Sequence, residues 1–297
     1  MIIKYIVEED NILIKEYLKS KKLSSNFLKK VKLYGEFRLN QQLVKNYHPL
    51  KKGDILELIL EEELNQEVQA KKIDLNILYE DEWLMVISKP RDLACQPTRK
   101  HLSDNVISAI KYYFLENNIT SNIHIVNRLD YSTTGLMIIA KCGFIHNALK
   151  QKQMTRKYIA LVEGYLNDKK GIIDLPIGRD NEISIKRKIS EKGKNAITEY
   201  VVLEESDNTS YLLLKLHTGR THQIRLHLSH MGFSIVGDGL YGKESGELKL
   251  HCCYLEFIHP VLEKMIVLEE NPIWYQSSIN YKLIWKYNHW KKDIFFI

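Results

Sequence analysis

The sequence has few of the residues that break helices and strands or cross-link a chain. It holds six prolines and 14 glycines in 297 residues, and it contains no long low-complexity linker. Its four cysteines form no Cys-x-x-Cys pair, and Cys252 and Cys253 are adjacent, which suits neither an ordinary disulfide nor a zinc cluster. We interpret the cysteines as reduced, buried thiols of a cytoplasmic protein.

Long apolar runs are also missing. The apolar stretch after Met1 is interrupted by Lys4 and then by three acids, so it does not resemble a signal peptide. No uninterrupted run approaches the ~20 apolar residues of a membrane-spanning helix. We therefore expect no membrane partner. A composition of 44% hydrophobic and 27% charged residues is typical of a folded domain.

Positive charge is concentrated near the N-terminus. Residues 1–60 contain 12 Lys/Arg and 7 Asp/Glu, and seven lysines with one glutamate lie between Lys15 and Lys32. Such a cluster is typical of a surface that binds a polyanion. A solvated, lysine-rich helix face would have the same composition, so the charge needs support from the pattern around it.

The pattern of this N-terminal segment predicts a small α/β module. Apolar spacing predicts two helical pieces within residues 11–33, with Ser25 as a cap of the second. Turn residues Gly35 and Asn40 then flank a short hairpin, and a Lys52–Asp54 turn precedes an apolar strand.

This order of elements resembles the S4 RNA-binding module over about residues 11–60. The resemblance implies RNA binding, which here would depend on the lysines. We predict an S4-like module over 1–65, a linker over 66–76, and a second domain over 77–297 that ends in an aromatic-rich C-terminal extension.

The second domain has the pattern of an α+β fold. Strand-like segments rich in β-branched and aromatic residues dominate, and helical pieces near 106–115, 144–153 and 222–231 are scattered among them. Because there is no regular βαβ alternation, we expect a mixed, largely antiparallel central sheet flanked by helices and loops. The expected strands are ILYEDEWLMVISKP, IHIVNRLD, TTGLMIIAK, RKYIALVEG, AITEYVVLEE and YLLLKLH.

Five motifs in a fixed order give the most specific signal. They are SKPRDLACQPT (88–98), VNRLDYSTTGLMIIAK (126–141), RKYIALVEG (156–164), GKNAITEY (193–200) and LHTGRTHQIRLHLSHMGFSIVGDGLYG (216–242). Together they resemble the RluA-type family of RNA pseudouridine synthases over about residues 75–270. The resemblance implies the pseudouridine synthase fold and the isomerisation of uridine in structured RNA to pseudouridine.

The chemistry of that reaction explains the residue types. The bond from ribose C1′ to uracil N1 is broken, the base turns, and it is rejoined through C5. This requires no metal and no cofactor, but it does require a carboxylate beside C1′. The resemblance implies that this carboxylate is Asp130. It also implies that Arg225 pairs with Asp130 and keeps it ionised, since a guanidinium suits a carboxylate better than an ammonium does.

The other predicted site residues would hold the RNA. By the resemblance, Arg128 enters the space that the extruded base leaves, and Tyr158 stacks on the base beside the sugar. We predict Lys89 and Arg220 as phosphate contacts. We assign His222 to hydrogen bonding in support of the site rather than to a metal, because the five-residue spacing of the nearby histidines does not align them on one helix face.

Alternatives remain open at this point. Asp130 and Arg128 could form a simple salt bridge in a turn, and Tyr158 or Arg225 could be structural. The chain could be a non-catalytic RNA-binding or RNA-chaperone protein on the same fold. A glycosidase is less compatible, because no second acid stands beside Asp130 in the motifs. The S4-like module favours ribosomal RNA over transfer RNA as the target, and we expect a monomer.

Overall fold

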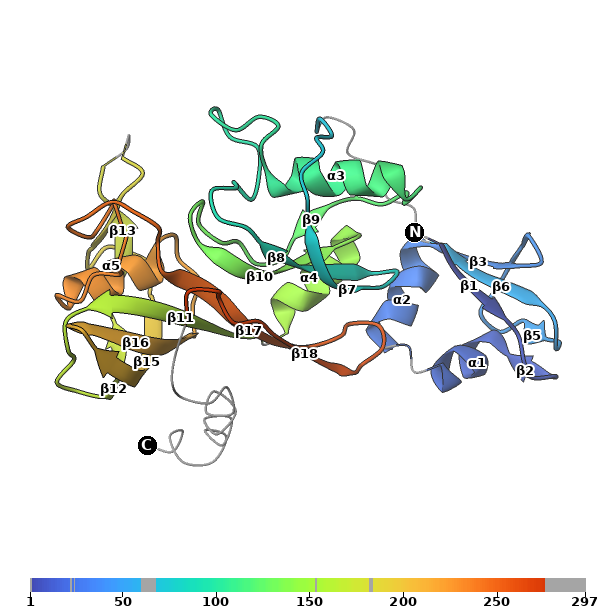
Figure 1. The fold of residues 1–297 in the computed structure, drawn as a ribbon. Coiled ribbons are helices and arrows are strands. Elements are labelled where there is room, and N and C mark those ends of the chain that lie inside the picture. Colours follow the sequence, from blue (N-terminus) through green and yellow to red (C-terminus); the bar gives the residue numbers. More distant parts are fainter. Residues whose placement is uncertain are drawn as a thin grey trace.

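The computed structural model describes residues 2–21, 23, 25–59, 68–152, 154–181 and 184–275. A small N-terminal unit lies beside a larger domain whose long strands run through the centre of the molecule (Figure 1). Residues 60–67 and 276–297, which include part of the predicted linker and most of the predicted C-terminal extension, lie outside the described residues.

The N-terminal unit combines two helices with a four-stranded sheet. The sheet order is β1-β6-β3-β4, and a short β2–β5 pair lies beside it. The elements are β1 (Ile2–Ile6), β2 (Ile12–Leu13), α1 (Ile14–Ser20), α2 (Ser25–Tyr34), β3 (Glu36–Leu39), β4 (Gln42–Val44), β5 (Pro49–Leu50) and β6 (Ile55–Ile59).

Local sequence explains most of this unit. The β3–β4 turn falls at Asn40 and Gln41, whose positive φ angles of 50° and 72° are those that two-residue hairpins require. The first predicted helical piece begins later than expected, because Ile12 and Leu13 pair with β5 as a strand. Their apolar side chains fit either a strand or a helix start, so periodicity alone could not separate the two.

An aromatic contact joins the N-terminal unit to the larger domain. The rings of Phe27 in α2 and Phe144 in α4 (Gly143–Gln151) lie with their centroids 5.4 Å apart. The buried residues of both units form one continuous hydrophobic cluster. The two units therefore share one hydrophobic core as well as one polypeptide chain.

The larger domain is built on a ten-stranded sheet of order β12-β15-β16-β11-β17-β10-β8-β7, with β18 beside β17 and β9 beside β10. Its β10–β17 pair is parallel and its other described ladders are antiparallel, which confirms the predicted mixed, largely antiparallel sheet. The strands are β7 (Asn76–Glu80), β8 (Leu84–Lys89), β9 (His124–Ile125), β10 (Thr134–Ala140), β11 (Thr155–Glu163), β12 (Lys170–Asp174), β15 (Ile197–Ser206), β16 (Thr209–Leu216), β17 (Leu250–Ile258) and β18 (Met265–Glu269).

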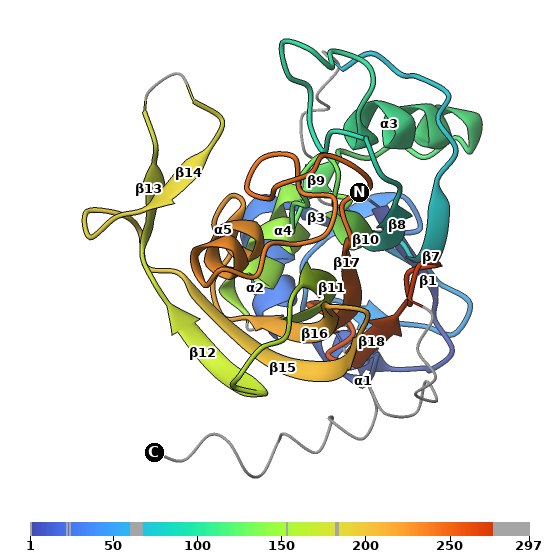
Figure 2. The same ribbon diagram turned by 60° about the vertical axis from the view of Figure 1, so that its left-hand side comes forward.

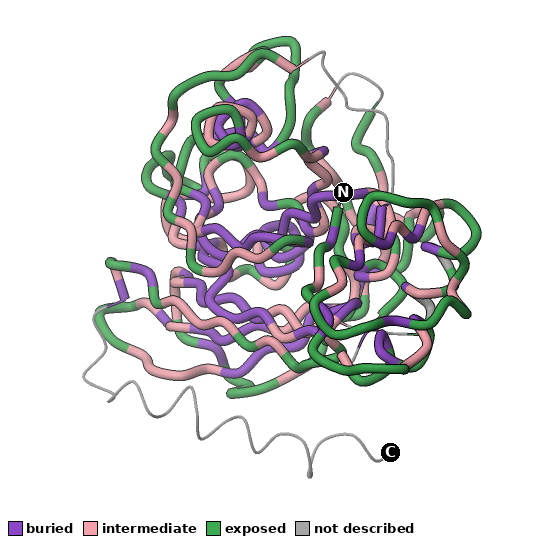
Figure 3. Tube along the Cα trace, turned by 90° about the vertical axis from the view of Figure 1, so that its right-hand side faces the viewer, coloured by how far each residue is buried: buried purple, intermediate pink, exposed green. Residues whose placement is uncertain are grey.

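Helices and loops surround this sheet, and the described helices of the larger domain are α3 (Val106–Glu116), α4 and α5 (Gln223–His230). A separate hairpin of β13 (Ile177–Arg179) and β14 (Arg187–Ile189) projects from the body (Figure 2). Buried residues concentrate in the central strands, whereas the outer loops of the N-terminal unit are exposed (Figure 3). All four cysteines are free and buried, as predicted. Within the described residues, no helix has the length and apolar character needed to cross a membrane.

Two predicted strands differ from the structure. ILYEDEWLMVISKP forms the hairpin β7–β8 rather than one strand. Its turn contains neither Gly nor Pro and is instead held by Asp81, whose Oδ1 accepts hydrogen bonds from the backbone N–H groups of Trp83 and Leu84. In IHIVNRLD only His124 and Ile125 are strand, and the chain then leaves the sheet as a loop.

Gly135 is required where β10 meets β17. Its φ is +107°, and a Cβ there would lie 2.7 Å from the backbone nitrogen of Cys252 and closer still to its carbonyl oxygen. We expect Gly135→Ala to lower the free energy of unfolding by about 2–3 kcal/mol, because it combines backbone strain with a clash against a strand. Urea unfolding followed by circular dichroism measures this loss.

The matched control for Gly135→Ala is Gly232→Ala. Gly232 has a similar φ of +88°, but nothing lies within 4 Å of a Cβ at this position. Its substitution should cost about 1 kcal/mol, from strain alone. Equal losses in the two variants would contradict the role assigned to the close approach of β17.

Candidate active site

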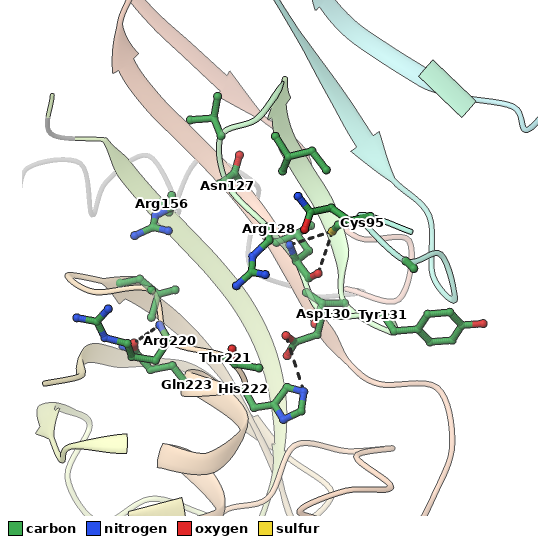
Figure 4. A pocket seen from close by; sticks show the side chains of 18 of the residues that line it. Cys95, Asn127, Arg128, Asp130, Tyr131, Arg156, Arg220, Thr221, His222 and Gln223 are labelled. Atoms are coloured by element: carbon green, nitrogen blue, oxygen red, sulfur yellow. Dashed lines mark hydrogen bonds and ion pairs between the residues drawn. The ribbon is translucent and has the colours of Figure 1, made fainter. Parts of the chain in front are cut away.

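A cleft with a volume of about 970 Å³ opens where the half of the sheet that contains β10 meets the half that contains β11. It is lined by the loop 94–98 after β8, the segment 123–131 before β10, the loop 219–225 at the start of α5, and side chains of β11. Figure 4 shows these segments facing one another across the cleft. Asp130 is the single acidic side chain among the described residues that line it.

The turn that carries Asp130 is fixed by its neighbours. Asn127 takes the place of a strand partner for β10: its Nδ2 donates to the carbonyl of Leu136 at 3.1 Å, and its Oδ1 accepts from the N–H of Ile138 at 2.8 Å. The N–H of Thr133 donates to the carbonyl of Asp130, which closes the turn. The carboxylate is thus presented at the cleft by an anchored backbone, with 23% of its side chain exposed.

Arg225 lies opposite Asp130, as predicted. Its Nη1 is 3.6 Å from Asp130 Oδ2. The same guanidinium makes a closer, bidentate pair with Asp238, through Nε to Oδ2 at 2.8 Å and Nη2 to Oδ1 at 2.6 Å. Asp238 therefore orients Arg225 and leaves one nitrogen directed at Asp130.

Asp238 is a functional candidate that sequence reasoning missed. It lies in the quoted VGDGLYG segment, but a lone Asp between glycines is equally typical of an exposed turn. Instead it is buried, and its Oδ1 also accepts from the N–H groups of Leu240 and Tyr241. Burial alone would raise the pKa of this carboxyl, but the hydrogen bonds and charge of Arg225 outweigh burial and lower it. The pair is therefore ionised at neutral pH.

His222 completes the group around the carboxylate. It precedes α5 with a left-handed backbone (φ 58°), and its Nε2 lies 4.0 Å from Asp130 Oδ1. Its Nδ1 is 3.0 Å from the hydroxyl of Tyr241, whose ring also lies under the Arg225 guanidinium. Burial lowers the pKa of His222, so the imidazole is neutral at pH 7.

The neighbouring histidines do not join His222 in a metal site. His217 pairs with Glu199, and His227 is buried against Thr198 and the carbonyl of Leu175. Among the residues that the structure describes, there is no group of three or more His, Cys, Asp or Glu side chains suited to a metal ion.

Tyr158 reaches the cleft from β11 at an irregularity in the sheet. The register between β11 and β17 shifts between Lys157 and Tyr158, which is the kind of bulge that re-aims a side chain. Tyr158 is almost fully buried and lines the cleft beside Leu250. Burial raises the pKa of its hydroxyl well above the usual value, so the phenol remains protonated.

Three arginines surround the cleft as its cationic rim. Arg128 is exposed, and Arg220 donates through Nε to the carbonyl of Asn195. Arg156, which was not predicted, packs so closely on Gly219 that a Cβ there would lie 3.0 Å from its Nη1. Figure 4 shows Arg156 and Arg220 on segments across the cleft from the segment that carries Arg128. This rim suits an anionic substrate.

The phosphate-contact role predicted for Lys89 is wrong. The side chain is fully buried, and its Nζ donates to the carbonyls of Pro90, Leu93 and Tyr131 at 2.8–3.0 Å. Burial lowers the pKa of Lys89 to about 8. The ammonium therefore ties the loop after β8 to the turn that carries Asp130 and does not face the cleft.

Comparisons with known proteins point to one family. Residues 83–230 match the family model described as RNA pseudouridylate synthase. An uncharacterized RNA pseudouridine synthase of Bacillus subtilis strain 168, YjbO, is 35% identical over 260 residues, which cover 84% of this chain and 92% of that protein. Ribosomal large subunit pseudouridine synthase D of Pseudomonas aeruginosa is 36% identical and covers 70% of this chain and 71% of its own length.

A solved structure shows the same architecture. Human RNA pseudouridylate synthase domain containing 1 superposes with a TM-score of 0.56 and 26% identity, over 67% of this chain and 84% of the human chain.

Proposed function

Because the chain belongs to the RNA pseudouridine synthase family, we propose that its cleft isomerises a specific uridine of ribosomal RNA, with Asp130 as the reacting carboxylate. The observation that carries this assignment is the isolated acid in a cationic cleft. Asp130 faces Arg225 at 3.6 Å, with Arg128, Arg156 and Arg220 around it. Such a cleft attracts an RNA strand and leaves one anionic group to act at the sugar.

Asp130 acts at ribose C1′ while the C1′–N1 bond of the target uridine breaks. The freed uracil turns, C5 bonds to C1′ and loses its proton, and N1 gains a proton, so the product is an isomer of the substrate. The Arg225 guanidinium lies 3.6 Å from the carboxylate, and Asp238 keeps that guanidinium in place. The ring of Tyr158 supplies an apolar face on which the uracil can stack as it turns.

The uridine must leave its stack before it can reach Asp130. Extrusion of a base costs a few kcal/mol, least in loops and bulges. Arg128 is two residues from Asp130, exposed at the cleft. We assign it to the space vacated by the base, where its planar guanidinium stacks on the neighbouring bases. This position leaves Arg225, rather than Arg128, as the cation that holds Asp130.

The N-terminal unit supports ribosomal RNA as the substrate. Its helices α1 and α2 carry exposed lysines at Lys15, Lys19, Lys29 and Lys32. The family match over residues 83–230 does not extend to this unit, so its S4-like role rests on its charge and its order of elements. The P. aeruginosa relative is named for the large ribosomal subunit, which favours ribosomal over transfer RNA here.

Pseudouridine mapping tests the substrate. Ribosomal and transfer RNA from cells with and without the gene are treated with a pseudouridine-specific reagent and sequenced. We expect one or a few ribosomal positions to lose the modification in the deletion strain and to regain it with the wild-type gene. Loss at transfer RNA positions alone would overturn the ribosomal assignment.

The salt dependence of RNA binding tests the N-terminal unit. Lys29 and Lys32 both lie exposed on α2. If each contacts a phosphate, Lys29→Ala/Lys32→Ala should reduce the slope of log affinity against log salt by about 1.4, since each single-strand contact contributes roughly 0.7. The control Lys170→Ala/Lys264→Ala removes two exposed lysines from the larger domain and should leave the slope unchanged. Equal slopes in all three proteins would contradict RNA binding by α2.

A further inference from the structure

A stacked aromatic pair stands at the edge of the cleft and has no part in the chemistry above. The rings of His101 and Tyr131 lie with centroids 4.8 Å apart and planes inclined by 30°. Both residues line the cleft, and Tyr131 directly follows Asp130. Figure 4 shows the Tyr131 ring directed away from His222.

The Tyr131 side of the pair is held rigidly. Its carbonyl accepts the buried ammonium of Lys89 at 2.9 Å, within the turn that Thr133 closes on Asp130. The backbone of Tyr131 therefore keeps a fixed position relative to that of Asp130. Yet 42% of Tyr131 is exposed, so the stack on His101 covers only part of it.

The His101 side is anchored just as firmly. Thr98 and His101 exchange two backbone hydrogen bonds, and the Asn105 side chain donates to the carbonyl of His101. Between Thr98 and His101 lie Arg99 and Lys100, both exposed at the tip of this turn. The pair thus combines a pre-ordered aromatic surface with two adjacent cations.

We propose that the His101–Tyr131 pair is a binding site for the nucleobase next to the target uridine in RNA. This proposal rests on the proposed function, because extrusion of the uridine removes a base from the stack of its two neighbours, and the small Arg128 guanidinium replaces that base only in part. A ring one residue from Asp130 is placed to receive that neighbour, and Arg99 and Lys100 can bind its phosphate. Stacking on an aromatic ring accepts any base, so the site stabilises the extruded state without reading sequence.

The alternative is that the pair only fixes the loop 98–101. A double-mutant cycle between protein and RNA separates the two roles, because only a direct contact couples a side chain to one base. The probe is a synthetic stem-loop that contains the uridine mapped in the deletion strain. It is prepared intact, with an abasic 5′ neighbour, and with an abasic 3′ neighbour.

Binding of these RNAs is measured with wild type, Tyr131→Ala, Tyr131→Phe, and the control Tyr165→Ala, which removes another exposed tyrosine of the larger domain. We expect Tyr131→Ala to weaken binding of intact RNA about tenfold, as loss of one stacked base does. Tyr131→Phe and Tyr165→Ala should bind like wild type. One abasic RNA should bind wild type about tenfold more weakly but should lose nothing further with Tyr131→Ala.

Several outcomes would overturn the proposal. In one, Tyr131→Ala weakens binding by the same factor whether the RNA is intact, abasic at the 5′ neighbour or abasic at the 3′ neighbour. That result would indicate a structural role for the pair. Another is wild-type affinity of Tyr131→Ala for the intact RNA. Failure of the proposed function looks different: wild-type protein would then restore no pseudouridine to the deletion strain, whatever residue stands at position 131.

Discussion

We expect Asp130→Asn to abolish pseudouridine formation and to leave RNA affinity almost unchanged. Asparagine keeps the size and the hydrogen-bonding capacity of the side chain but carries no negative charge, so it can neither attack C1′ nor stabilise charge there. We expect a loss of at least about 10³-fold in rate, which corresponds to about 4 kcal/mol of transition-state stabilisation. A single-turnover assay on the mapped RNA measures the rate, and a filter-binding assay measures affinity.

The control for this variant is Asp207→Asn. Asp207 is exposed in the turn between β15 and β16, where its positive φ suits asparagine equally well. It should keep wild-type activity. Residual activity of Asp130→Asn within tenfold of wild type would refute the assignment of Asp130. Loss of RNA binding in the same variant would instead indicate that the cleft had collapsed. The non-catalytic RNA-binding alternative predicts no modification by any of these proteins.

Asp238→Ala should damage stability and activity together. The side chains of Arg225 and Asp238 are only 7% and 1% exposed, so removal of the carboxylate leaves a buried guanidinium with Asp130, 3.6 Å away, as its remaining acidic partner. Breaking such a pair costs about 3–5 kcal/mol of unfolding free energy. The freed Arg225 would also shift relative to Asp130, so we expect a rate loss of about 10²-fold as well. Urea unfolding and the single-turnover assay measure the two effects.

A double variant separates the two effects. Arg225→Met/Asp238→Asn replaces the buried ion pair with uncharged side chains of similar size and keeps an oxygen that accepts from the N–H groups of Leu240 and Tyr241, which should restore most of the lost stability. It removes the cation beside Asp130, so activity should stay low. A double variant with both stability and activity restored would show that Arg225 serves folding alone. Full activity in Asp238→Ala would show that Arg225 needs no orienting partner.

The sequence predicted the strands and site residues that local patterns encode. Thr134–Ala140 forms a strand as expected, because a long β-branched and apolar run leaves few other choices. Asp130 and Arg225 were predicted from motifs that carry them, and the structure brings them together from distant parts of the chain. The β7–β8 hairpin was missed because its turn depends on the Asp81 side chain rather than on Gly or Pro.

Other features depend on contacts that no local pattern encodes. Lysines are almost always exposed, and Lys89 is buried only because three carbonyls from two separate loops converge on its ammonium. The role of Asp238 depends on the position of α5 relative to the turn after Ile235. The LHCCYLEFI segment gives no sign that it pairs with β10 on one side and β11 on the other.

Because β17 lies at the centre of the sheet, assembly of the cleft depends on the order in which the chain is translated. Strands β7–β10 form one half of the sheet, and β11, β12, β15 and β16 form the other. In the described chain β17 is the strand that pairs with both halves. A nascent chain that lacks Leu250–Ile258 can form two half-sheets, with Asp130 on one and Tyr158 and Arg225 on the other. The N-terminal unit is therefore translated long before the cleft is complete, because Asp130 and Arg225 come together only once β17 has emerged from the ribosome.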